Sequence, residues 1–121
     1  MKTTQRNAVI AYSALIGMGR KPMKSRTAYK LFRLRLKLKE IVDFQAEQET
    51  KLCQEMGVTI SDDGRFQFPD DKIKEQFETA HKELEETECE IDENEIKIGI
   101  NELPDLSINE LEALDGFVKF E

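Results

Sequence analysis

The two cysteines and the single histidine of this 121-residue chain are its best candidates for nucleophilic or metal chemistry. A structural zinc site needs closely spaced ligands, such as two cysteines separated by two residues. Cys53 and Cys89 stand far apart, and neither forms such a spacing with His81. We therefore expect two partly buried free thiols and a histidine at the boundary of an apolar helix face. We expect neither a metal nor a cofactor.

Acidic residues offer a second kind of chemistry, and Asp62-Asp63-Gly64 invites a calcium interpretation. A calcium loop of the EF-hand type needs oxygen ligands at alternating positions and a glutamate at position twelve. Phe66 and Phe68 fall among the following positions, so the spacing fails. Asp-Gly instead predicts a tight turn, because glycine adopts positive φ. No phosphate loop or nucleophile elbow is present, and we predict a protein that is not an enzyme.

Charge is distributed unevenly along the chain, whose formal net charge is −7. Residues 1–40 carry eleven basic side chains and one acidic one, for a net charge of +10. Residues 41–121 carry seven basic and 24 acidic side chains, for a net charge of −17. Such asymmetry indicates either a nucleic-acid contact or a basic element that packs against an acidic one.

The basic residues include a set at helical spacing, which we call the basic stripe. Its 4/3/4 spacing places these side chains on one helix face, next to a helix N-terminus that favours anions. The candidate anion- or partner-binding residues are Lys24, Ser25, Arg26, Lys30, Arg33 and Lys37. One hypothesis is phosphate or nucleic-acid contact. The overall negative charge and the lack of aromatic residues interleaved with the stripe disfavour it.

The other hypothesis is that the basic stripe faces an acidic helix or remains solvated. The candidate acidic partner surface lies on the third predicted helix and consists of Glu75, Glu78 and Glu85. This helix could meet the basic stripe within one chain or across a dimer. In either arrangement little basic surface would be left for nucleic acid.

Hydrophobic spacing predicts four helices, at residues 4–18, 26–56, about 71–87 and 108–115. Ser25 is the expected N-cap of the long second helix, and Gly57 its C-terminal stop. About thirty residues at 1.5 Å each reach roughly 45 Å, against a compact radius of gyration of about 13–14 Å. The long helix must therefore project, bend or pack against another chain, and a homo-oligomer through this helix is one possibility.

Alternating apolar residues predict short strands in the second half of the chain. A hairpin is expected over residues 58–68, two strands joined by a turn at residues 92–94, and a last strand at 117–120. The predicted class is α+β, with a small antiparallel sheet. We expect a single domain over residues 1–121, with a basic helical region at 1–57 and an acidic α+β region at 58–121. No apolar run reaches the roughly 20 residues of a membrane span. The start of the chain does not resemble a signal peptide and the two cysteines are well separated, so a cytoplasmic location is expected.

Much of the chain resembles small proteins of unknown function that tailed phages and prophages of Gram-positive bacteria encode. The matching positions are Asn7, Lys24, Ser25, Arg26, Gly57, Asp63, Gly64, Phe77, Leu84 and the segment 111–121. The resemblance implies no catalytic residues. It implies a phage product that acts inside a bacterial host. Our leading hypothesis in that setting is a protein that binds another protein, either in virion assembly or by blocking a host defence factor. The alternative is a nucleic-acid-binding accessory protein that uses the basic stripe.

Overall fold

The computed structural model describes residues 1–121. Its elements are β1 (Lys2–Thr4), α1 (Gln5–Gly17), α2 (Ser25–Met56), β2 (Thr59–Ile60), β3 (Phe66–Gln67), α3 (Asp71–Glu85), β4 (Glu88–Glu90), β5 (Ile96–Ile98), a 3-10 turn (Ile100–Glu102), α4 (Ile108–Leu114) and β6 (Val118–Phe120). The predicted α+β fold, with one long helix and a short C-terminal helix, is confirmed.

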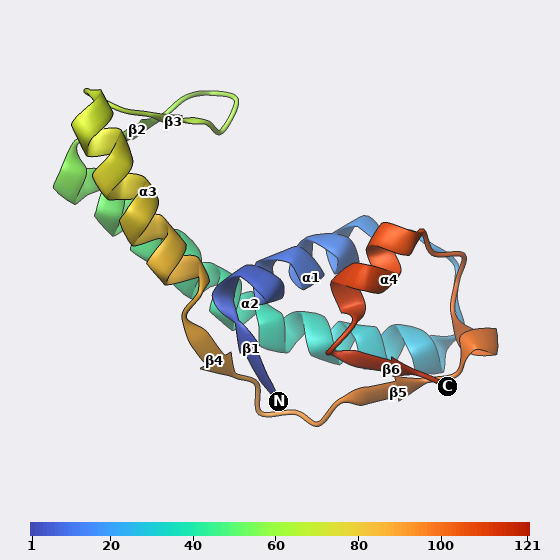
Figure 1. The fold of residues 1–121 in the computed structure, drawn as a ribbon. Helices are drawn as coiled ribbons and strands as arrows, with labels where there is room; N and C mark the ends of the chain where they lie inside the picture. Colours follow the sequence, from blue (N-terminus) through green and yellow to red (C-terminus); the bar gives the residue numbers. More distant parts are fainter.

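Helix α2 runs through the whole molecule and connects two parts (Figure 1). We call one part the body; it contains α1, the first half of α2, β1, α4 and strands β4 to β6. We call the other the arm; it contains the second half of α2, the β2–β3 hairpin and α3. With 32 residues, α2 is about 48 Å long, which is why the arm projects from the body.

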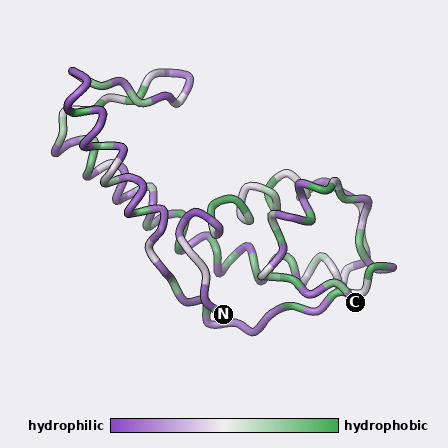
Figure 2. Tube along the Cα trace, in the orientation of Figure 1, coloured by the Kyte–Doolittle hydropathy of each residue, from purple (hydrophilic) through white to green (hydrophobic).

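The main hydrophobic core lies in the body, where α1 packs against the first half of α2. Ala8 and Ala11 are fully buried, and their small side chains let the two helix backbones approach closely. Figure 2 shows α1 largely in hydrophobic colours, whereas α3 is mostly hydrophilic. The other members of this core are Leu15, Met18, Leu31, Leu34, Leu38, Ile91, Ile96, Ile98, Leu114, Phe117 and Val118.

A second and smaller cluster holds the arm together. Phe77 of α3 is 1% exposed and packs with buried Cys53 and Val58. The rings of Phe66, the first residue of β3, and Phe68, which directly follows β3, lie 4.8 and 5.5 Å from the Phe77 ring. The hairpin therefore covers the end of the α2–α3 pair.

The strands form three two-stranded ladders. β2 pairs with β3 in the predicted antiparallel hairpin, and Gly64 adopts φ +84° in its turn. The segments on either side of residues 92–94 do not pair with each other. β4 instead pairs antiparallel with β1, a strand that the sequence patterns did not predict, and β5 pairs in parallel with β6. The N-terminal ammonium of Met1 donates to the carbonyl oxygens of Ile91 and Glu93, so the expected turn segment is bound to the N-terminus and no local hairpin forms.

Side chains cap the N-termini of three of the four α-helices. The side chains of Thr4, Asp70 and Ser107 accept hydrogen bonds from the first turns of α1, α3 and α4, and Ser107 forms a capping box with Glu110. Ser25 was predicted to cap α2, but it is the first helical residue, and Lys24 holds the cap position without a side-chain hydrogen bond. No helix in the structure has the length and apolar character needed to cross a membrane.

Candidate partner-binding surface on helix α2

Two residues of the basic stripe bind the strand region of the body. Lys30 Nζ donates a 2.7 Å hydrogen bond to the carbonyl oxygen of Lys97. Arg33 Nη2 lies 3.1 Å from Glu93 Oε2, in an ion pair at the surface. Both contacts connect α2 to the segment around β5, so Lys30 and Arg33 of the basic stripe help to stabilise the fold.

One of our hypotheses was that the basic stripe faces the acidic third helix of its own chain. In the structure the two do not face each other. α3 begins at Asp71, after the hairpin, and runs back along the second half of α2. Its 15 residues extend only about 22 Å, which is too short to reach residues 26–37. Glu75 and Glu78 are exposed on the arm, whereas Glu85 is half-buried and binds His81.

The rest of the basic stripe has no acidic partner within the chain. Lys24, Ser25 and Arg26 are exposed at the start of α2, and Lys37 is half-buried. None of the three basic residues among them forms an ion pair. Because only Arg33 of the stripe pairs with a carboxylate, most of this positive charge is available to another molecule.

An aromatic residue lies within the basic stripe, contrary to our expectation. Tyr29 is 61% exposed, three residues after Arg26 and four before Arg33. Residues at these spacings are neighbours on a helix surface. Sequence reasoning missed Tyr29 because the run Ala-Tyr-Lys-Leu-Phe-Arg-Leu does not show which apolar residues the body covers.

Further large apolar side chains continue along the outer surface of α2. Phe32, Leu36 and Phe44 are 46%, 49% and 46% exposed. Phe32 and Leu36 follow Tyr29 at spacings of three and four, so the three form one row, which we call the exposed row. Arg33 and Arg35 flank this row, giving an apolar surface within a basic rim.

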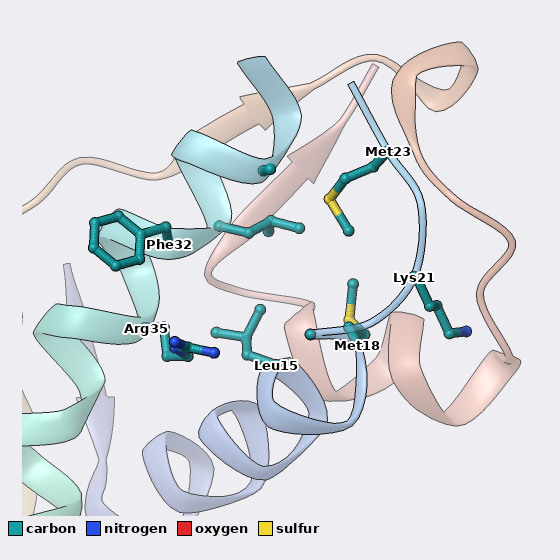
Figure 3. Close-up of a pocket in the computed structure, with 9 residues that line it drawn as sticks. Leu15, Met18, Lys21, Met23, Phe32 and Arg35 are labelled. Atoms are coloured by element: carbon teal, nitrogen blue, oxygen red, sulfur yellow. The ribbon is translucent and has the colours of Figure 1, made fainter. Parts of the chain in front are cut away.

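A pocket opens beside Phe32, between the end of α1 and the first half of α2 (Figure 3). Its volume is about 200 Å³, and we call it the α1–α2 pocket. Met18 and Met23 extend into it, Leu15 forms its floor, and the Arg35 side chain lies beside Leu15. Its other lining residues are Gly19, Lys21, Ala28, Leu31 and Phe32.

The Lys21 ammonium points away from this pocket toward α4. Its Nζ lies 2.9 Å from Glu110 Oε1 and donates to the carbonyl oxygen of Asp105 at 2.7 Å. The Ser107 backbone N–H and then Lys21 hold the pKa of the Glu110 carboxyl below its ordinary value. Lys21 thus links the loop between α1 and α2 to α4. Arg35, by contrast, has no carboxylate partner.

The single histidine lies inside the arm. Its Nε2 is 3.1 Å from Glu49 Oε1 on α2, and its Nδ1 is 2.8 Å from Glu85 Oε1, one helical turn further along α3. The His81 ring stacks on Phe77 at a centroid distance of 5.7 Å. His81 therefore lies at the edge of an apolar face, as predicted, and links α2 to α3.

Both cysteines are free thiols, as predicted: Cys53 is buried, and Cys89 is partly exposed. Burial raises the pKa of both thiols, and the Glu49 carboxylate adds to the effect at Cys53. A raised pKa keeps a thiol protonated and weakly nucleophilic at neutral pH. No group of three or more histidine, cysteine or acidic side chains is placed to hold a metal ion.

Comparison with known proteins identifies no relative of this chain. No protein-family model, curated protein or solved structure matches the chain. The resemblance to phage proteins therefore stays a prediction.

Proposed function

We propose that this protein is not an enzyme and acts by binding another protein through the exposed row of α2. The observation that carries the proposal is the exposure of Tyr29, Phe32 and Leu36 on a rigid helix whose opposite face is the core of the body. Tyrosine and arginine are enriched among the residues that contribute most to protein interfaces. The basic rim favours a partner with an acidic surface.

The biological setting is also part of the proposal. The resemblance to phage proteins supports a product that acts in the cytoplasm of a bacterial host, either as a virion assembly factor or as an inhibitor of a host defence protein. Both roles require a specific protein contact, and neither requires catalysis. The exposed row and its basic rim supply the surface for that contact.

Affinity capture from phage-infected or lysogenic cells tests this function. Wild-type protein should retain one defined partner after nuclease treatment of the lysate. The double variant Tyr29→Ala, Leu36→Ala should reduce capture at least tenfold, because truncating a central interface residue commonly costs 1 kcal/mol or more. Ile60→Ala provides the matched control, since Ile60 is 54% exposed but lies in the arm hairpin. Equal capture by wild type and the double variant would contradict the proposal.

The second candidate function is nucleic-acid binding, and Tyr29 is the observation that favours it. An exposed aromatic ring among Arg26, Lys30 and Arg33 can stack on a base while the basic side chains contact phosphates. Binding of single-stranded DNA should then weaken by orders of magnitude between low and physiological salt. Charge reversal at Arg26, Lys30 and Arg33 should abolish it. DNA binding that persists in this variant would exclude the basic stripe as its site.

A further inference from the structure

We propose that the α1–α2 pocket receives the acidic C-terminal segment of a second copy of this chain, with Ile108 as the inserted side chain. This inference goes beyond the proposed function, because it assigns a different partner to a neighbouring surface of α2, which shares Phe32 and Arg35 with the exposed row and its basic rim but not Tyr29 or Leu36. Ala28, Leu31 and Arg35 line the pocket on one flank of the helix, whereas Arg26, Lys30 and Arg33 lie on the other.

The pocket has the size and lining of a receptor for one apolar side chain. At about 200 Å³, it is smaller than the 300–1,000 Å³ typical of small-molecule sites. Met18 and Met23 form two of its walls, and methionine side chains adapt readily to an incoming apolar group. Phe32, which is 46% exposed, stands at its edge.

Ile108 is the matching apolar group on the surface of the same chain. It is 81% exposed, the highest exposure among the large apolar residues. Ile108 is the first residue of α4, whose Leu114 is anchored in the core. The side chain is therefore held on an ordered helix, and insertion would not require a new segment to fold.

Charge complementarity supports a second copy as the occupant. The segment between Lys97 and Lys119 contains no basic residue and five acidic ones: Glu102, Asp105, Glu110, Glu112 and Asp115. Glu112 lies one helical turn after Ile108, on the same face of α4, and it is exposed without an ion pair. Arg35, beside the pocket, also lacks an ion pair. Insertion of Ile108 would bring these two charges together.

The position of Lys21 indicates how two copies could associate. Lys21 lines the pocket and also bonds to Glu110 on α4, so the pocket and the helix that carries Ile108 are neighbours within one chain. Two copies related by a two-fold axis can then exchange both contacts at once. Such reciprocal exchange closes a dimer and leaves no unfilled pocket, whereas a one-sided contact would propagate into a chain of molecules.

Light scattering coupled to size exclusion tests the dimer over concentrations of about 1 μM to 1 mM, the range of weak specific association. The wild type should shift reversibly from 14.0 kDa to twice that mass. Ile108→Asp should weaken association by about 10- to 100-fold, the equivalent of losing one buried isoleucine side chain. Ile60→Asp is the matched control on the arm and should dimerise normally.

A charge exchange provides the second test. Arg35→Glu and Glu112→Arg should each weaken the dimer, and the double variant should restore it at least tenfold relative to either single variant. Glu112 is exposed, so Glu112→Arg leaves the monomer folded even if Arg35→Glu does not. A monomer at every concentration, or a dimer unaffected by Ile108→Asp and Glu112→Arg, would overturn the proposal.

The same variants separate this proposal from the proposed function. Ile108→Asp should weaken the dimer by the same 10- to 100-fold and leave partner capture intact. Tyr29→Ala, Leu36→Ala should reduce capture at least tenfold and leave the dimer intact. Loss of the dimer in the Tyr29/Leu36 variant, with Ile108→Asp still dimeric, would place self-association on the exposed row and refute the use of the pocket.

Discussion

His81 and Glu49 join α3 to α2, with the histidine Nε2 3.1 Å from a glutamate Oε1. The other ring nitrogen of His81 lies 2.8 Å from Glu85. A neutral imidazole carries one N–H and donates to one of these carboxylates, whereas an imidazolium donates to both. The histidine thereby adds directional contacts to an arm whose apolar cluster contains only three buried residues.

Replacing His81 by alanine should loosen the arm while leaving the body folded. We expect a loss of about 1 kcal/mol in the stability of the α2–α3 pair, typical of a lost side-chain hydrogen bond. Amide hydrogen exchange should accelerate in α3 and remain unchanged in α1 and β6. Lys82→Ala is the control, because Lys82 is highly exposed and makes only a 3.9 Å ion pair with Glu86. Unchanged exchange in α3 of the His81 variant would contradict this role.

The Glu110 carboxylate, which accepts hydrogen bonds from the Ser107 backbone N–H and from Lys21, should make the stability of the body depend on pH. The pKa of Glu110 is lower in the folded chain than in the unfolded chain, so its contribution is fully present above the unfolded pKa of about 4.3. The contribution disappears as pH falls through the lowered folded pKa. Glu110→Gln should therefore be less stable than wild type at pH 7 in urea unfolding, and the two proteins should converge at strongly acidic pH.

Glu83→Gln is the control for this measurement, because Glu83 is exposed on α3 and forms no ion pair. It should unfold like the wild type at both pH values. If the difference in unfolding free energy between wild type and Glu110→Gln remained the same at strongly acidic pH, lost packing, and not the charged contact, would be the cause of the destabilisation.

The two thiols should react slowly in the folded protein. Burial raises the pKa of Cys53 and of Cys89, which lowers the thiolate fraction at pH 8, and it also restricts access. In an assay with an aromatic disulfide reagent, Cys53 should react more slowly than Cys89, since Cys53 is only 7% exposed. Single Cys→Ser variants distinguish the two thiols. Equal rates of thiol reaction in buffer and in urea would show that the folded structure does not protect the cysteines.

Gly57 and Gly17 should respond in opposite ways to substitution by alanine. Gly57 ends α2 at φ +68°, where a Cβ costs about 1–2 kcal/mol through backbone strain. Gly17 is helical, and a Cβ there meets no atom within 4 Å. Gly17→Ala should therefore stabilise the protein by about 0.5–1 kcal/mol. Thermal unfolding measures both effects, and a stabilising Gly57→Ala would contradict the left-handed helix end.

Local interactions explain which features the sequence could predict. The end of α2 at Gly57 and the hairpin turn at Gly64 depend on residues within one turn, so local sequence was sufficient to find them. The pairing of Thr3 with Cys89, and of Ile96 with Val118, joins residues far apart in the chain. No local pattern encodes such partners, and both pairings were missed.

The candidate binding surface was predictable only in part. The spacing of Arg26, Lys30, Arg33 and Lys37 correctly placed them on one face of α2. The exposure of Tyr29 and Phe32 could not be predicted, because packing against α1 and the strands decides which of the neighbouring apolar residues is covered. Leu31 and Leu34 are buried, whereas Tyr29 and Phe32 remain accessible.

The continuity of α2 has a mechanical consequence. Residues 41–56 extend about 24 Å beyond the body at 1.5 Å per residue, so a 10° tilt at their base displaces the hairpin by about 4 Å. Such a tilt would pivot near Ile41, the last residue of α2 that packs against the core of the body. A molecule bound to Ile60 in the hairpin would act on the same helix that carries Tyr29. Force could then pass along α2 from the hairpin to the body without any rearrangement of the core.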